Sequence, residues 1–336
     1  MKRWLFTALS FAVVIGVSVY AVRSSAPDGV ALTIPPVAHL LALAAFVIEV
    51  VARSLKMSWS ARAVGTSLPF LTAVRTSLGG DFGASITPAR AGAEPTRYLI
   101  LAESGIARPA LIVILYTELF FEMISLVIVA AAMLLVYRAS RTAALTMAGV
   151  VGTYSATILS IAAAGVFLAN ARVGDAPPPW AQRVKLTGGR WAFVLRWVER
   201  VRSTVVAFRT MDVRWGVASC LASVVHVAVR FTILPMIVLT IAGPAVPLGP
   251  LVLWPFTLIY GANVMPAPGG GGAVELVFRA SLGHAIPAPA FAAALVWWRF
   301  YTFYLYIALG ALVAGRLTLR AIRQTADTEK PLARHA

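Results

Sequence analysis

The sequence predicts an all-α integral membrane protein with about six full transmembrane helices and two re-entrant helical hairpins, from eight hydrophobic segments. Of its 336 residues 60% are hydrophobic and only 12% are charged, against about 25% charged in a soluble domain. The mean hydropathy is +0.83. The longest stretch without a membrane-length apolar run, about residues 171–214, is much shorter than the roughly 100 residues of an ordinary domain. We therefore interpret residues 1–336 as a single transmembrane domain.

Composition also limits the partners and cofactors. The net charge is +16, and 25 of the 29 basic residues are arginine. These charges border apolar segments, as cytoplasmic loops and contacts with anionic lipids require, so we do not expect nucleic acid as a partner. Cys220 is the only cysteine and the four histidines are scattered. We expect neither a metal site nor a cofactor.

The first apolar segment, residues 5–22, has two readings. It is either an uncleaved first span or a cleaved signal peptide, and the flanking Tyr20 and Arg23 favour the span because they suit a membrane interface. Residues 37–52 then return to the cytoplasm, where Arg53, Lys56 and Arg62 are expected.

A re-entrant hairpin is predicted next. The weaker apolar run 61–78 leads into Gly79-Gly80-Asp81-Phe82-Gly83, then a segment around Pro88, then the short apolar piece 98–102. Glycine and proline clusters do not suit a continuous helix. Non-helical backbone at membrane depth is tolerated only inside protein or beside a wet cavity, which indicates a helix entering, a broken tip and a short helix leaving.

The middle of the chain contains two strong spans, residues 110–137 and 142–170, followed by the basic cytoplasmic linker 171–214. Apolar side chains recur there at three-to-four spacing, which predicts an amphipathic helix on the membrane surface. They are Trp191, Leu195, Val198, Val201, Val205 and Phe208.

A second broken segment follows the span 217–242. Residues 251–264 run into Met265-Pro266-Ala267-Pro268 and four glycines, and a short apolar piece ends at Leu282. Residues 288–313 form the last span, and residues 317–336 a cytoplasmic tail.

The two broken segments suggest an internal repeat, with repeat A at about residues 36–137 and repeat B at about 215–316. Each segment has a Pro-Ala step followed by a glutamate, Glu94 or Glu275. With both termini inside, the two hairpins open to opposite sides, so the topology is inverted, as in many transporters. Chance similarity of two Gly/Pro loops is the alternative, and Arg138 and Arg141 then fall on the outer side.

Acidic residues in apolar segments are the candidates for chemistry. Seven of the thirteen lie in or beside such segments: Glu49, Asp81, Glu94, Glu103, Glu118, Glu122 and Glu275. A charge at the bilayer centre costs at least about 2.5 kcal/mol, so each needs a partner or water. The candidate partners are Arg90, Arg97, Arg108, Arg230 and Arg299.

Glu118 and Glu122 are four residues apart and therefore share a helix face. Coupling to a proton or cation and structural pairing with arginine are both open, whereas no nucleophile motif supports hydrolysis. The glycine run 269–272 either brings backbone close to a ligand or only permits a bend. A helix starting near Ala273 would direct free N–H groups at an anionic headgroup.

Several of these motifs together resemble a known family. Pro266-Ala267-Pro268-Gly269-Gly270-Gly271-Gly272-Ala273-Val274-Glu275 is similar to its proline-glycine-glycine signature followed by glutamate. Gly92-Ala93-Glu94-Pro95-Thr96-Arg97-Tyr98, Glu118-Leu119-Phe120-Phe121-Glu122 and Arg299 resemble its other elements. The chain resembles the flippase-like transmembrane part of the lysylphosphatidylglycerol synthetase/flippase family. Leu119 and Glu122 depart from its arginine and aspartate, and Arg90 and Ala91 from smaller residues or glycine.

The resemblance implies a lipid flippase-like transporter that moves an anionic or aminoacylated (glyco)lipid across the bacterial inner membrane. The alternative is a non-transporting lipid-binding or scaffold protein of envelope lipid biosynthesis. Larger members add a cytoplasmic aminoacyl-transfer domain, which this sequence lacks, so we expect no enzyme activity and no catalytic residue. The expected partners are membrane lipids, either an anionic phospholipid or a polyprenyl-linked lipid, and the sequence leaves a homodimer open.

The expected substrate-binding residues come from both hairpins and the last span: Arg90, Glu94, Arg97, Pro266, Gly269, Gly270, Gly271, Glu275 and Arg299. Glu118 and Glu122 are expected to be coupling or structural acids.

Overall fold

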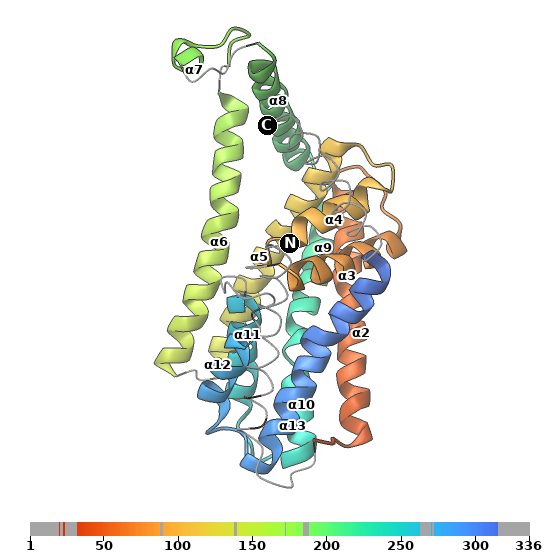
Figure 1. Cartoon of the computed structure of the whole chain (residues 1–336), viewed down its shortest axis with the longest axis vertical. Helices are drawn as coiled ribbons and strands as arrows, with labels where there is room; N and C mark the ends of the chain where they lie inside the picture. The colour runs from red at the N-terminus through yellow and green to blue at the C-terminus, as the bar shows by residue number, and fades with distance from the viewer. Residues whose placement is uncertain are drawn as a thin grey trace, which may run out of the picture.

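The computed structural model describes residues 32–87, 90–137, 140–171, 173–183, 188–262, 270 and 272–314, together with Tyr20 and Arg23. Every regular element in these ranges is helical (Figure 1), which confirms the all-α class. The predicted first span at residues 5–22, apart from Tyr20, and the predicted tail at 317–336 lie outside the described residues.

The helices follow one another along the chain with short connections. They are α2 (Pro36–Ala63), α3 (Phe70–Ser85), α4 (Ala93–Ala102), α5 (Arg108–Val136), α6 (Arg141–Asn170), α7 (Pro179–Arg183), α8 (Gly189–Arg209), α9 (Val213–Arg230), α10 (Ile233–Ala242), α11 (Leu248–Gly261), α12 (Ala273–Leu282), α13 (Ala288–Arg299) and the π-helix η4 (Phe300–Tyr304). Five helical stretches in the described part are long and apolar enough to cross a membrane: residues 36–63, 110–136, 141–170, 213–242 and 288–314.

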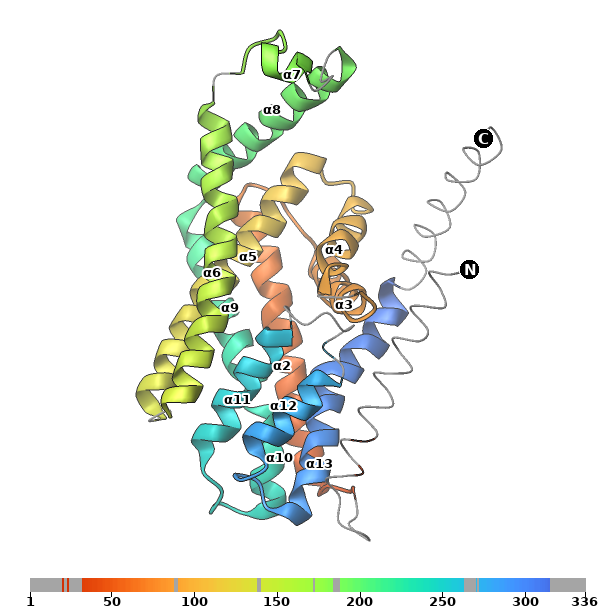
Figure 2. The ribbon, with the colours of Figure 1, turned by 60° about the vertical axis from the view of Figure 1, so that its left-hand side comes forward.

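Two hairpins of shorter helices lie among these spans. α3 packs against α4, and α11 packs against α12. The loops on either side of the α3–α4 hairpin lie toward one end of the molecule, and those on either side of the α11–α12 hairpin lie toward the other (Figure 2). The two hairpins therefore enter the bundle from opposite ends, while the division into two repeats stays a prediction.

The first hairpin breaks later than its glycines predict. The expectation that the Gly79–Gly83 cluster does not suit a continuous helix is wrong, because α3 continues through these residues to Ser85. Pro88, the position of the predicted break, lies outside the described residues. Gly80 faces α4, and a Cβ atom there would lie 2.6 Å from the Nε atom of Arg97. The glycines allow two helices to approach closely, and the chain turns after Ser85, where Arg90 adopts a left-handed φ of 56°.

The first described span also extends further than predicted. Arg53 and Lys56 were expected in the cytoplasm, but α2 continues past them, and they are 2% and 0% exposed. Only Arg62, in the last turn, is exposed. Hydropathy ends the span at the first basic residue, whereas the fold keeps these residues inside because acidic partners surround them.

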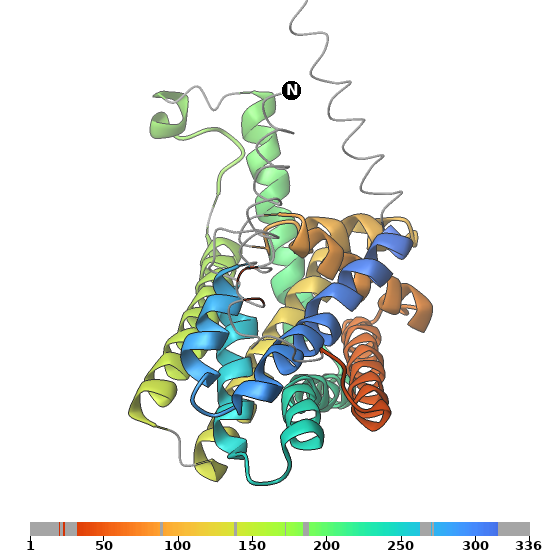
Figure 3. The same ribbon diagram turned by 60° about the horizontal axis from the view of Figure 1, so that its bottom comes forward.

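The largest apolar core joins α2 and α10 to α11, α12 and α13, and Ile237, Phe278 and Trp298 are fully buried there. α6 lies at the opposite edge of the bundle from α2 (Figure 3), and only 6% of its apolar window is buried. Exposed apolar surface of this extent suits contact with lipid. The chain is thus a multi-pass membrane protein.

The opposite entry of the hairpins predicts opposite accessibility of their loops. In a Cys220→Ser background we expect Ser104→Cys, between α4 and α5, and His284→Cys, between α12 and α13, to react with a membrane-impermeant thiol reagent from opposite sides of sealed vesicles. Ser104 and His284 are both exposed. Thr210→Cys, in the exposed turn after α8, is the control and should react from the side of Ser104→Cys. Labelling of both hairpin loops from one side would contradict the arrangement.

Candidate functional site

A network of charged side chains occupies the space where α2, α3, α4, α5 and α9 meet. It contains five acids, Glu49, Asp81, Glu94, Glu118 and Glu122, and five bases, Arg53, Lys56, Arg90, Arg97 and Arg230. Burial of single ions is expensive, and it becomes tolerable when opposite charges are paired and hydrogen-bonded. Equal numbers of acids and bases meet that condition.

Glu118 is the centre of one half of the network. Its carboxylate lies 2.7 Å from the Nζ atom of Lys56 and 2.7 Å from a terminal guanidinium nitrogen of Arg97. Lys56 also contacts Glu122 at 2.9 Å, and Glu122 accepts a hydrogen bond of 3.3 Å from the hydroxyl of Tyr260 on α11. These contacts join α2, α4, α5 and α11 through side chains that are at most 15% exposed.

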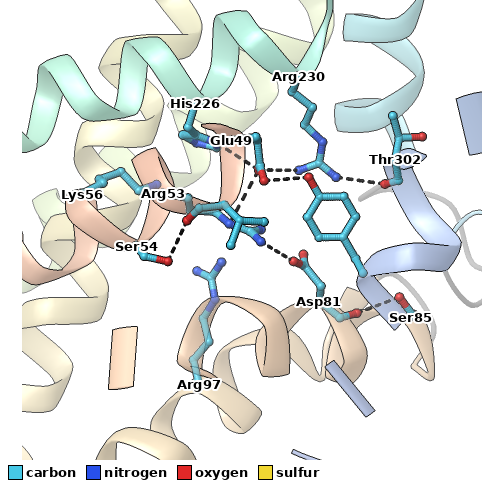
Figure 4. Close-up of polar contacts among 12 residues, drawn as sticks. Glu49, Arg53, Ser54, Lys56, Asp81, Ser85, Arg97, His226, Arg230 and Thr302 are labelled. Carbon is cyan, nitrogen blue, oxygen red and sulfur yellow. Dashed lines mark hydrogen bonds and ion pairs between the residues drawn. The ribbon is translucent and has the colours of Figure 1, made fainter. Parts of the chain in front are cut away.

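Glu49 is the centre of the other half (Figure 4). Its carboxylate accepts a hydrogen bond of 2.6 Å from Tyr306, and lies 3.6 Å from Arg53, 3.7 Å from Arg230 and 3.3 Å from Nδ1 of His226. The two guanidinium groups lie 5.3 and 5.1 Å from the centre of the Tyr306 ring. Glu49 thereby connects the first described span to α9 and to the last span.

The network reaches the surface at the tip of the first hairpin. Arg53 binds Asp81 of α3 at 2.7 Å, and Arg90 at the tip lies 3.5 Å from the same carboxylate. The Arg90 side chain is 22% exposed, and that of Glu94 in the first turn of α4 is 40% exposed, whereas Glu118 is fully buried. A continuous set of charges thus leads from the surface of the protein to its interior.

A separate ion pair connects the second hairpin to the last span. Glu275, in the first turn of α12, accepts a hydrogen bond of 2.8 Å from Nε of Arg299, and both side chains are buried. The guanidinium of Arg299 also lies 4.2 Å from the centre of the Phe303 ring. α12 begins at Ala273, as predicted from the glycine run. Within the described residues, no ion pair connects Glu275 or Arg299 to the larger network.

The structure brings together five of the predicted site residues, Arg90, Glu94, Arg97, Glu118 and Glu122, and it places Glu275 against Arg299. Gly270 is buried with a left-handed φ of 68°. Pro266, Gly269 and Gly271 lie outside the described residues. In the described part, no group of three histidine, cysteine, aspartate or glutamate side chains is placed to hold a metal ion.

The sequence interpretation missed the roles of three residues. Arg53 and Lys56 bind Asp81, Glu118 and Glu122, and His226 lies against Glu49. A signal was present, because positions 49, 53 and 56 fall at four- and three-residue intervals and so share one helix face. Their polarity made them resemble the end of a span.

The sequence comparison agrees with this architecture. The family model described as the lysylphosphatidylglycerol synthase TM region matches residues 7–310. The chain belongs to this family. The match includes both hairpins and all but the last residues of the described spans. No curated protein matches the chain.

Because Lys56 is buried between Glu118 and Glu122, we expect its removal to destabilise the fold strongly. We expect Lys56→Met to lower the free energy of unfolding by about 3–5 kcal/mol, because Glu118 and Glu122 would stay buried without their shared cation. Denaturant unfolding in micelles measures the change.

The matched control is Arg75→Met, which removes a base from an ion pair of 3.5 Å whose side chains are 46% and 43% exposed. We expect a loss below about 1 kcal/mol for this exposed pair. Equal losses for the two variants would show that the buried network does not stabilise the fold.

Proposed function

We propose that this member of the lysylphosphatidylglycerol synthase TM region family is a lipid flippase-like transporter. Its substrate is an anionic or aminoacylated (glyco)lipid of the bacterial inner membrane. The observation that carries the proposal is the charge network that begins at the exposed tip of the first hairpin and ends at fully buried side chains. Ionisable groups inside membrane spans are rare, and they often mark substrate or ion pathways.

A lipid headgroup can exchange partners with such a network. Phosphate is recognised by arginine through charge-assisted hydrogen bonds, and Arg90 and Arg97 lie nearest the exposed edge. An ammonium on the headgroup would instead bind Glu94, which is the most exposed acid of the network. Because the protein's charges are already paired, a zwitterionic or anionic group enters by replacing one partner at a time.

The second hairpin supports passage toward the other side. The Glu275–Arg299 pair repeats the combination of acid and arginine on a hairpin that enters from the opposite end. Half-helices that enter from both ends are the arrangement in which transporters place their binding sites. The arginine-rich α8 is proposed to face the cytoplasm, as the positive-inside rule requires, and the proposal contains no catalytic step and no cofactor.

A flux assay tests the transport. Purified protein is reconstituted in liposomes that contain leaflet-specific fluorescent probes with anionic, aminoacylated or zwitterionic headgroups. We expect wild-type protein to move at least one charged probe faster than protein-free liposomes. Glu275→Gln should lower that rate about tenfold or more, because a charged hydrogen bond of about 1.5–3 kcal/mol is lost.

Glu103→Gln is the control, since Glu103 is exposed and pairs only with Arg75 among the described residues. Its flux should equal that of wild type. If wild-type protein and protein-free liposomes move every probe equally, the chain is not a transporter of these lipids.

The second candidate is a non-transporting lipid-binding or scaffold protein for envelope lipid biosynthesis. The exposed basic side chains of α8, among them Arg196, Arg200 and Arg209, favour it, because they offer a charged surface beside the membrane. A partner that stays bound through purification, together with absent flux, would support this function over transport.

A further inference from the structure

A second site lies apart from the charge network, in a pocket of about 590 Å³ between α5, α6 and α8. Pockets of roughly 300–1,000 Å³ hold ligands of drug or lipid size. The walls are almost entirely apolar and include Ile112 and Phe120 of α5, Ile161 and Val166 of α6, and Val205 and Phe208 of α8. The rings of Phe120 and Phe208 meet edge to face at 5.1 Å and close one wall.

The pocket and the network use opposite faces of α5. Tyr116 and Phe120 line the pocket, whereas Glu118 and Glu122 belong to the network. At 100° per residue, a shift of two positions turns a side chain to the far side of the helix. α5 packs against α6, α8 and α4, and in Figure 2 α6 lies on one side of α5 and the α3–α4 hairpin on the other.

Two arginines at the edge of the pocket have no partner among the described residues. Arg200 and Arg209 line it and are exposed, and neither side chain forms an ion pair or hydrogen bond with another described residue. Their neighbour Arg202 differs, because it donates hydrogen bonds of 3.0 and 2.6 Å to the carbonyls of Ala169 and Ala171 at the end of α6. One arginine therefore holds α8 against α6, and two are left for a ligand.

We propose that this pocket binds one anionic phospholipid of the cytoplasmic leaflet, with an acyl chain between α5, α6 and α8 and its phosphate between Arg200 and Arg209. An apolar cavity with a cationic edge complements an amphiphile that has an anionic head. A lipid source is indicated by α6, whose apolar window is only 6% buried, so the pocket wall continues into the surface that faces the bilayer.

Two features of α8 agree with the depth of a headgroup. Trp197 lines the pocket and is 47% exposed, and tryptophan is enriched at membrane interfaces, where its ring is apolar and its N–H is wet. The side chains of α8 that line the middle of the pocket are mostly apolar, among them Val201 and Val205, while Arg200 comes before them and Arg209 after them, so charged groups border an apolar stretch. The site goes beyond the proposed function, since binding there requires no transport.

Photolabelling of the full chain in nanodiscs tests the site. The bilayer contains phosphatidylglycerol and phosphatidylcholine, and in separate samples one of them carries a photoactivatable acyl chain. Peptides from α6 and α8 are then analysed by mass spectrometry. We expect the phosphatidylglycerol probe to label pocket residues several-fold more than the phosphatidylcholine probe. Arg200→Gln and Arg209→Gln should each lower that labelling about fivefold, the effect of about 1 kcal/mol per arginine near a membrane surface.

Two pairs of variants separate this site from general contact with lipid. Arg196→Gln removes an exposed α8 arginine that does not line the pocket and should leave labelling unchanged. A Cβ atom on Gly165 would lie 3.8 Å from Val205, so the side chain of Gly165→Leu would project into the pocket, whereas Gly152 on the same helix has no atom within 4 Å of a Cβ position. Gly165→Leu should lower the labelling, and Gly152→Leu should not.

Three outcomes would overturn the proposal. Equal labelling by both probes in wild-type protein would mean that α6 only has ordinary boundary lipid. Undiminished labelling of Gly165→Leu and of the two pocket-arginine variants would place the lipid elsewhere. Absence of label from the pocket residues with the phosphatidylglycerol probe would show that the pocket holds no such lipid. None of these results depends on flux, so transport can fail while the site stands.

Discussion

The carboxylate of Glu118 accepts contacts from Lys56 on α2 and from Arg97 on α4, and it is fully buried, so no water replaces either partner. This three-way contact fixes where the first hairpin lies against two spans. The close approach of α3 to α4 depends on it as well, because Gly80 leaves room for the Arg97 side chain that reaches Glu118. Without that carboxylate, Arg97 would keep only Glu94 as a partner, at 3.1 Å, and the Glu94 side chain is 40% exposed.

The same construction recurs in the second hairpin with the signs reversed. In the first, the short helix α4 supplies the base and the following span α5 the acid, whereas in the second α12 supplies the acid and α13 the base. Charged and polar residues also occupy corresponding positions in α2 and α9. Glu49 and His226 each come thirteen residues after the first residue of α2 and α9, and an arginine follows four residues later in both. These correspondences involve side chains that meet around Glu49, and the division of the chain into two halves stays a prediction.

Much of the fold could be predicted from hydropathy and from the positions of glycine and proline clusters. The spans, both hairpins and the start of α12 could be predicted, because apolar runs of membrane length and Gly/Pro clusters are local signals. The site was predictable only in part. Arg97 and Glu118 were recognisable as charges in unusual places, but Arg53 and Lys56 were read as the end of a span, since local sequence does not reveal that Asp81 and Glu122 lie beside them. Likewise, the sequence around the glycines of α3 does not distinguish a helix break from close packing against another helix. The difference depends on α4, which lies against Gly80 in the structure.

The balance of the network has a consequence for energetics. A charge that crosses the membrane field exchanges about 2.3 kcal/mol per 100 mV, so a rearrangement that carried unbalanced charge would be driven or opposed by the membrane potential. With all five acids and five bases ionised, the network carries no net charge, so a displacement of the whole network along the membrane normal does no electrical work. A step in which one of its charges moves relative to the others does such work, as does the charge of a bound molecule.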